Sequence, residues 1–284
     1  MNTIVYDSGE ERKLLRLFFD LIQARELLLS LVWKELRVRY RYAVMGFLWA
    51  VIEPLAFTLI LTFVFSFVFA DRAGLMQPSA GPPFAVMLLC GLIFWQYLST
   101  SLAAATTSIV DNKTLVTKVR FAREVIPISS CCMPLVQLGI GFVLLLAAHL
   151  FFGGGIGFSL LYIPFIFGVQ FLLTIGVALF LACAHVHYRD VGSLIRVTLL
   201  LGFYASPVFY PLEMVRAASF PAWVTTAYLI NPMAGLLTCY RQAMFEQRLP
   251  DLSLFAWPAL CAVAVFIFGA LLFRRFAPTM SDYL

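Results

Sequence analysis

Residues 34–41 read KELRVRYR, and residues 46–70 read GFLWAVIEPLAFTLILTFVFSFVFA. The first stretch gathers four cations: Lys34, Arg37, Arg39 and Arg41. The second is an apolar run whose single charged residue, Glu53, is followed at once by Pro54. A cationic helix at a membrane surface that leads into a spanning helix has this pattern. The stretch therefore predicts an integral membrane protein.

The composition agrees with that prediction. Of the 284 residues, 62% are hydrophobic and 12% are charged, whereas soluble domains are about 45–50% apolar and about 25% charged. We expect a single transmembrane domain over residues 1–284, with an interface region at 1–43, a membrane core at 44–273 and a cytoplasmic tail at 274–284. The net charge of +5 is modest, and we expect no nucleic-acid partner.

Six apolar runs predict membrane spans of about 20 residues or more. They cover residues 44–70, 84–108, 126–152, 156–185, 193–210 and 253–273. The predicted fold class is an all-α integral membrane protein with six transmembrane helices. Between the last two runs, residues 211–252 alternate aromatic and turn residues, and 233–245 reads as a helix too short and polar to span. We predict re-entrant gate helices there, on the outer side, with protein covering their backbone.

The distribution of lysine and arginine predicts the orientation. Sixteen of the 20 residues precede the first run or lie near 113–123, near 189–196 or in the tail, and four lie on the other side. Cytoplasmic segments carry the excess of positive charge in membrane proteins. Both termini are therefore expected in the cytoplasm.

A first segment on that side, residues 25–42, predicts an amphipathic helix. Its cations recur at helical spacing, while Leu28, Leu31, Val32 and Leu36 fall on another face. Such a helix suits the lipid headgroup region and would also contact a partner protein. A plain flank that only anchors the first span is the alternative interpretation.

A second segment, residues 111–124, predicts a short helix in a cytoplasmic loop. Asp111 or Asn112 is a suitable cap for it, and three apolar residues share one face: Leu115, Val116 and Val119. This helix would be presented to a cytoplasmic partner, and a solvated connector is the alternative.

The sequence predicts no catalytic residues and no metal site. It has no G-x-x-x-x-G-K-[ST] motif for cradling a nucleotide. The six cysteines form no C-x-x-C pair, and the three histidines form no H-E-x-x-H motif. Glu53 is the one acidic residue inside the predicted spans, and we expect it to pair with a nearby arginine. Active transport would then draw its energy from another subunit.

Six motifs, taken in order, resemble the permease subunits of ABC-2 type exporters, in the branch that exports lipid-linked polysaccharides such as O-antigen and teichoic acid. The motifs are Lys34–Arg41 with Gly46–Trp49 and Glu53-Pro54, Gly91–Trp95, Lys118–Pro127, Arg189-Asp190, Ser206–Pro211 and Asn231-Pro232. Ala122 departs from the family pattern, which more often has proline there. This departure loosens the turn before Arg123 and leaves the class unchanged.

The resemblance implies a division of labour between subunits. The chain would pair with a second copy of itself and bind two ATP-binding-cassette ATPase subunits, which hold ATP and Mg. It would itself be no enzyme and carry no cofactor. Its cargo would be a polysaccharide linked to undecaprenyl pyrophosphate, moved across the bacterial inner membrane. The family's coupling loop corresponds to Lys118, Arg120, Arg123 and Glu124.

A glycan channel would need aromatic rings, because the C–H faces of sugars pack weakly and repeatedly on them. The candidates for glycan contact are Phe57, Phe94, Trp95, Tyr97, Phe203, Tyr204, Phe209 and Tyr210. Aromatic residues are also ordinary in membrane cores and interfacial belts. At the cytoplasmic entrance, Arg37, Arg39 and Arg41 are candidates for the carrier's pyrophosphate, with ordinary anionic membrane lipid as the alternative ligand.

Two other functions fit parts of the pattern. An ABC-2 exporter of a drug or other small lipophile would share the spans and need no continuous aromatic track. A membrane glycosyltransferase or polymerase would need paired carboxylates for a metal-bound nucleotide sugar, and the sequence shows no such pair. A purely structural scaffold would explain the spans but not the ordered motifs.

Overall fold

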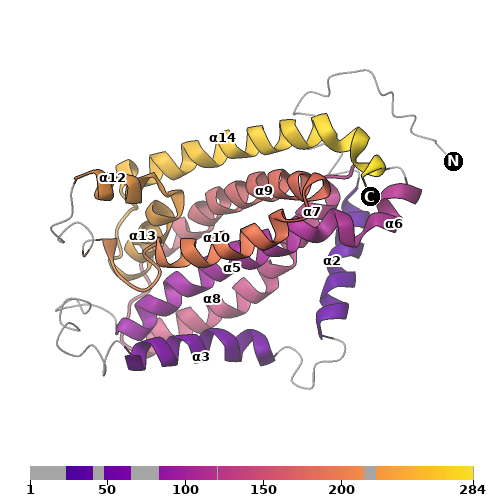
Figure 1. The fold of residues 1–284 in the computed structure, drawn as a ribbon. Coiled ribbons are helices and arrows are strands. Elements are labelled where there is room, and N and C mark those ends of the chain that lie inside the picture. Colours follow the sequence, from indigo (N-terminus) through magenta and orange to yellow (C-terminus); the bar gives the residue numbers. More distant parts are fainter. Residues whose placement is uncertain are drawn as a thin grey trace.

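The computed structural model describes residues 24–40, 48–64, 83–119, 121–212, 214 and 222–283. Within these ranges all regular structure is helical, as predicted (Figure 1). The longer helices are α2 (Arg25–Tyr40), α3 (Trp49–Phe63), α5 (Phe84–Asp111), α8 (Pro134–Phe151), α9 (Ile163–His187), α10 (Val191–Tyr204), α13 (Pro232–Phe245) and α14 (Leu252–Phe276). The shorter ones are α6 (Lys113–Lys118), α7 (Val125–Cys132), α12 (Ala222–Ile230) and the 3-10 turns η3 (Phe158–Tyr162) and η4 (Ala277–Asp282).

Four continuous helical stretches are long and apolar enough to cross a membrane. They are Phe84–Asp111, Val125–Phe151, Phe158–His187 and Leu252–Met280. They confirm that the second, third, fourth and sixth predicted spans are long apolar helices. Two shorter apolar helices, Val51–Phe63 and Val191–Tyr204, lie where the first and fifth spans are predicted. The count of six spans therefore stays a prediction.

The body of the molecule is a bundle in which α5, α8, α9 and α14 run alongside one another (Figure 1). α5 is its most enclosed member: 78% of its most apolar 18-residue stretch is buried, compared with 22% for α14. α14 packs along α9, and α3 packs against α5 and α8. The outer surface of α14 remains apolar, for example at Leu260 and Phe268, as expected for a helix that faces lipid.

Two glycines set the distance between α9 and α14. A Cβ atom added to Gly269 would lie 2.1 Å from the carbonyl oxygen of Gly176. A Cβ atom added to Gly176 would lie 2.6 Å from backbone atoms of Phe266. The two backbones are therefore in direct contact, which small residues permit between helices in a membrane.

The two ends of the bundle differ. α2 crosses the bundle at one end, close to α6 and η4, whereas α12 and α13 lie at the opposite end (Figure 1). By the charge distribution, the α2 end is the predicted cytoplasmic end and the α13 end is the predicted outer end. α12 and α13 occupy the position of the predicted gate helices. Their re-entrant character stays a prediction.

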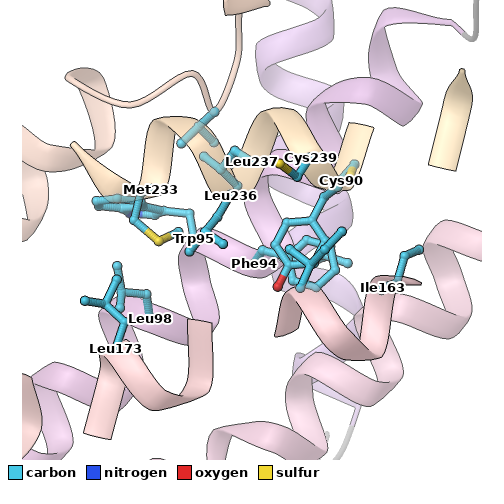
Figure 2. Packing of buried hydrophobic residues seen from close by; sticks show 14 of the residues in the cluster. Cys90, Phe94, Trp95, Leu98, Ile163, Leu173, Met233, Leu236, Leu237 and Cys239 are labelled. Carbon is cyan, nitrogen blue, oxygen red and sulfur yellow. The ribbon is translucent and has the colours of Figure 1, made fainter. Parts of the chain in front are cut away.

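Each end has its own hydrophobic core. At the α13 end, Figure 2 shows Met233 and Leu236 of α13 lying against Trp95 of α5. At the α2 end, a second core joins α2, α5, α6, α7, α9, α14 and η4. It includes Leu31, Val116, Ile126, Val186 and Phe273. Leu31 is 7% exposed, so the predicted apolar face of α2 is used to dock this helix onto the bundle.

Candidate translocation and coupling sites

Five aromatic rings from α5, α10 and the segment after α10 contact one another. The ring centroids of Trp95 and Phe203 are 6.2 Å apart, those of Phe203 and Phe209 are 5.9 Å apart, and those of Phe209 and Tyr210 are 4.8 Å apart. Tyr204 lies 5.2 Å from Phe203 and is 60% exposed. All five are predicted glycan-contacting residues. Their edge-to-face and tilted geometries are those that aromatic pairs prefer.

A sixth ring, Tyr228 of α12, extends this set. Its hydroxyl donates to the Tyr210 hydroxyl at 3.2 Å, and the Tyr210 hydroxyl donates to the carbonyl oxygen of Tyr204 at 2.9 Å. We call these six residues the aromatic cluster. Sequence reasoning missed Tyr228 because 18 residues separate it from Tyr210. The alternation of aromatic and turn residues in 220–232 was the available signal.

The other three predicted aromatics lie apart from the cluster. Phe94 is buried and stacks on Tyr240 of α13, with ring centroids 3.6 Å apart. Tyr97 is buried, contacts the ring of Phe167 edge-to-face and donates to the carbonyl oxygen of Cys131 at 3.3 Å. Phe57 of α3 is 50% exposed. In this single chain, Phe94 and Tyr97 are packing residues, and a glycan contact for any of the three stays a prediction.

A polar link accompanies the Phe94 stack. Gln170 of α9 donates from Nε2 to the carbonyl oxygen of Phe94 at 2.8 Å. The hydroxyl of Tyr240 donates to Gln170 Oε1 at 2.8 Å. The link ties α5, α9 and α13 together beneath the aromatic cluster and satisfies polar groups that would be costly to bury alone.

The non-helical segment that carries Phe209 and Tyr210 is fixed by hydrogen bonds from α13 and its cap. Asn231 donates from Nδ2 to Ser206 Oγ at 2.8 Å, and its Oδ1 accepts the backbone N–H of Met233 at 3.0 Å. Asn231 is thus an N-cap of α13. Arg241 donates from Nη2 to the carbonyl oxygen of Val208 at 2.7 Å and from Nη1 to that of Tyr210 at 2.8 Å.

Glu53, the one acidic residue of the predicted spans, lies on α3 and faces α8. Its Oε2 accepts a hydrogen bond from Gln137 Nε2 at 3.4 Å. A small crevice beside this pair is lined by Gln96, Tyr97 and Thr100 among others. The described partner of Glu53 is therefore the amide of Gln137, not an arginine. The arginine nearest to Glu53 in the sequence, Arg41, lies outside the described residues.

At the opposite end, the short helix predicted within residues 111–124 is α6, and the predicted coupling loop begins at its last residue. Lys118 ends α6 and is exposed. Glu124 and Arg274 of α14 form an ion pair at 3.4 Å with side chains only 12% and 11% exposed. Arg123 donates to the carbonyl oxygen of Ala277 in η4. Arg120 lies outside the described residues.

Two details of this loop differ from the prediction. Asn112 holds the N-cap position of α6, but its side chain makes no cap hydrogen bond. Its Oδ1 instead accepts from Lys34 Nζ at 2.9 Å and its Nδ2 donates to the carbonyl oxygen of Ser108 at 2.9 Å. Val119 does not share the apolar face of Val116, because the helix ends at Lys118; Val119 is extended and 50% exposed.

α2 confirms the predicted helix over Arg25–Tyr40, and the last two residues of the predicted 25–42 stretch lie outside the described residues. Side-chain hydrogen bonds at two adjacent residues attach α2 to the rest of the fold. Lys34 contacts Asn112 as described, and Glu35 accepts a hydrogen bond from Ser130 Oγ of α7 at 3.1 Å. Burial raises the pKa of the Glu35 carboxyl above its usual value, and the Ser130 hydrogen bond and the Lys34 charge oppose that shift. α2 therefore docks at the cost of partly desolvating an acid.

The predicted entrance arginines lie on or next to α2. Arg37 is exposed, on the same open face as Leu29 and Trp33, which are 55% and 60% exposed. The backbone of Arg39 belongs to α2, and Arg41 lies outside the described residues. An exposed tryptophan beside cations is typical of a helix in the headgroup region. Among the described residues, no three His, Cys, Asp or Glu side chains gather as metal ligands would.

These features define the class: a helical membrane protein of several spans, with aromatic rings at one end and a docked amphipathic helix at the other. The chain belongs to the ABC-2 type transporter family, whose model matches residues 26–245. It is 32% identical over 259 residues to the O-antigen export system permease protein RfbA of Myxococcus xanthus, covering 90% of this chain and 94% of that protein. Two RfbA permeases of Klebsiella pneumoniae are 27% and 26% identical, covering 80% and 88% of this chain and 83% and 93% of those proteins.

Proposed function

We propose that this chain is the transmembrane subunit of an ATP-driven exporter that moves a lipid-linked polysaccharide of the O-antigen kind from the cytoplasm across the inner membrane. Three permeases named for O-antigen export match it over most of its length. In this proposal the ATPase is a separate subunit that holds ATP and Mg. The chain contributes the path and the machinery that receives the partner's movement.

The observation that carries the proposal is the aromatic cluster at the predicted outer end. A polysaccharide must slide, so its contacts have to be weak and repeated. Rings offer faces to sugar C–H groups, and the hydroxyls of Tyr204, Tyr210 and Tyr228 offer exchangeable hydrogen bonds. Tyr204 is 60% exposed on α10, next to exposed Leu200 and Leu201. We assign this face to a channel formed with a second copy of the chain.

The α2 end supports the coupling part of the proposal. ATPase closure would push on α6 through exposed residues such as Lys118. The push would reach α2 through the Lys34–Asn112 hydrogen bond and α14 through the Glu124–Arg274 ion pair. Arg37 and its neighbours in sequence would receive the undecaprenyl pyrophosphate of the carrier, because arginine suits phosphate oxygens.

The test is complementation in a bacterial host that lacks its own O-antigen permease and retains its O-antigen synthesis genes. The chain is expressed together with the ABC ATPase of an O-antigen export system, and surface polysaccharide is measured with an impermeant lectin or antibody. We expect surface polymer with the wild type and a several-fold loss for Trp95→Ala and Tyr204→Ala. Copurification of the ATPase with each variant serves as the control for assembly.

Other outcomes would reject the proposal. Polymer that stays inside the cell with a fully assembled wild-type complex would exclude this cargo and favour a small-lipophile exporter. If cells without the chain made no polymer at all, inside or outside, the chain would act in polymer synthesis, which would favour a polymerase over an exporter. Normal surface polymer in both alanine variants would remove the aromatic cluster from the path while leaving the transporter class intact.

A further inference from the structure

The segment between α10 and α12 presents a problem of backbone polarity. α10 ends at Tyr204, and the chain from 205 to 211 is not helical, although Val208 is completely buried. Carbonyl groups that leave a helix lose their partners, and a buried carbonyl without a partner is costly, most of all at membrane depth. This segment needs donors that come from elsewhere in the fold.

Asn231 reaches the carbonyl oxygen of Ala205 at 3.4 Å, and one arginine supplies the donors for Val208 and Tyr210. Arg241 of α13 is only 6% exposed, and the two terminal nitrogens of its guanidinium bind the carbonyl oxygens of Val208 and Tyr210. The fork of a guanidinium matches two acceptors at once, which a lysine ammonium does not. Sequence analysis counted Arg241 only as one of four cations on the outer side. Its buried position gives it a role in positioning the backbone.

The opposite wall of this contact is a glycine. A Cβ atom added to Gly91 of α5 would lie 2.3 Å from the carbonyl oxygen of Val208 and 3.1 Å from Arg241 Nη2. The carbonyl is therefore held between the guanidinium and the bare backbone of α5. Gly91 begins the Gly91–Trp95 motif, so the same turn of α5 that fixes the segment also carries Trp95 of the aromatic cluster.

We propose that Arg241 is a positioning residue for the aromatic cluster, and that with Gly91 it fixes the 205–211 segment so that Phe209 and Tyr210 lie against Tyr204. This inference deepens the proposed function, and the export assay that tests it rests on that function. Arg241 acts on cargo only through the rings that it positions. The bidentate contact makes the outer-end rings a preformed surface.

The first experiment measures the segment directly, by amide hydrogen exchange of residues 205–212 in the purified chain in nanodiscs. We expect Arg241→Gln to accelerate exchange there at least about tenfold, the effect of losing one or both of its charge-assisted hydrogen bonds, and Arg241→Lys to give a smaller acceleration. The matched control is Arg248→Gln. Arg248 is an outer-side arginine whose side chain is 52% exposed and paired with Glu246 at 2.5 Å, so exchange in 205–212 should not change.

A second experiment uses a variant that displaces the segment without changing any charge, together with a matched control. Gly91→Ala should accelerate exchange in 205–212 as Arg241→Gln does, because its methyl group displaces the Val208 carbonyl. Gly139→Ala on α8 is the control, since nothing lies within 4 Å of its added Cβ. In the export assay, Gly91→Ala and Arg241→Gln should lower surface polymer several-fold with ATPase copurification unchanged, and Gly139→Ala should export normally.

Three results would overturn the inference. Unchanged exchange in 205–212 for Arg241→Gln would show that the arginine does not position the segment. Lost export with unchanged exchange would assign Arg241 to the cargo itself. Normal export in Gly91→Ala with accelerated exchange would separate the segment from transport. Accelerated exchange in a chain that moves no polysaccharide would uphold the positioning role and reject only the proposed cargo.

Discussion

Glu124 and Arg274 show how much one buried pair contributes at the residue scale. The pair joins the end of the loop after α6 to the end of α14, and both side chains are almost enclosed. Removing one member of a buried ion pair leaves the other charge without compensation, which is far more costly than losing an exposed pair. Arg123, the neighbour of Glu124, binds η4 through the carbonyl of Ala277. The C-terminal end of α14 and the following η4 are thus fixed to the predicted coupling loop by two adjacent residues.

Glu124→Gln should lower the stability of the solubilised protein by about 3 kcal/mol. The measurement is the thermal midpoint of the purified chain in detergent, followed by tryptophan fluorescence. The control is Glu246→Gln, which removes a partner of Arg248 from an exposed pair with side chains 46% and 52% exposed and should cost less than about 1 kcal/mol. Equal losses in the two variants would contradict the assignment of Glu124 as a buried anchor.

Glu35 gives a pH dependence with a defined sign. Burial raises the pKa of Glu35 in the docked helix, so the folded protein binds this proton at a higher pH than the unfolded chain does. The wild type therefore gains stability as the pH falls through the raised pKa, and it carries a desolvation cost above that pKa. Glu35→Gln removes the cost and keeps an acceptor for Ser130.

The stability advantage of Glu35→Gln over wild type should be largest near neutral pH and should disappear as the pH falls toward the usual carboxyl range. Thermal midpoints of both proteins across this range provide the test. Glu26→Gln, on an exposed position of the same helix, should show no comparable pH-dependent difference. If the stability advantage of Glu35→Gln grew as the pH fell, burial would not be raising the pKa of Glu35.

At the scale of elements, two residues that are adjacent in the sequence can point to different neighbours when they lie on a helix. Phe94 and Trp95 are both in the Gly91–Trp95 motif, yet successive residues on a helix point about 100° apart. Trp95 therefore reaches Phe203, while Phe94 stacks on Tyr240. Hydropathy predicted the helix but not which side would meet α13, because that depends on where α13 packs in the folded chain.

The glycine contact between α9 and α14 predicts a sharp difference between two equal substitutions. Gly269→Ala would place its methyl group against the Gly176 backbone and should cost about 1–3 kcal/mol, as overpacking does. Gly168→Ala, on α9 with nothing within 4 Å of the added Cβ, should be neutral or slightly stabilising. Thermal midpoints and the yield of monodisperse protein distinguish the two, and equal behaviour would show that α14 shifts freely along α9.

At the scale of the whole molecule, the sequence predicted most of the helices and little of their contacts. The long apolar runs, α2 and α6 could be placed because periodicity and charge act locally along the chain. The bonds of Lys34 to Asn112 and Arg241 to Val208 join residues 78 and 33 positions apart. Such pairs leave no periodic signal in a single sequence, so the role of Arg241 could not be recognised, and Tyr228 had only the alternation of aromatic and turn residues in 220–232 to indicate it.

The assembled complex provides the prediction at this scale. Lys118→Glu reverses an exposed charge at the end of α6 and should lower ATPase copurification several-fold, since a reversed rim charge opposes the partner's surface. Arg248→Glu, a charge reversal at the opposite end of the bundle, should leave copurification unchanged. Equal recovery of the ATPase with Lys118→Glu would remove α6 from the predicted interface.

The direct backbone contact between α9 and α14 also has a consequence for biogenesis. α14 is the last α-helix of the described chain to be synthesised, so the glycine face of α9 is made long before its partner. Until α14 is made, the backbone at Gly176 of α9 lacks its packing partner, and Glu124 lacks Arg274. A chain truncated before Leu252 should therefore expose the Gly176 face of α9 and leave Glu124 without its Arg274 partner, so we expect it to be less stable in the membrane than the full chain.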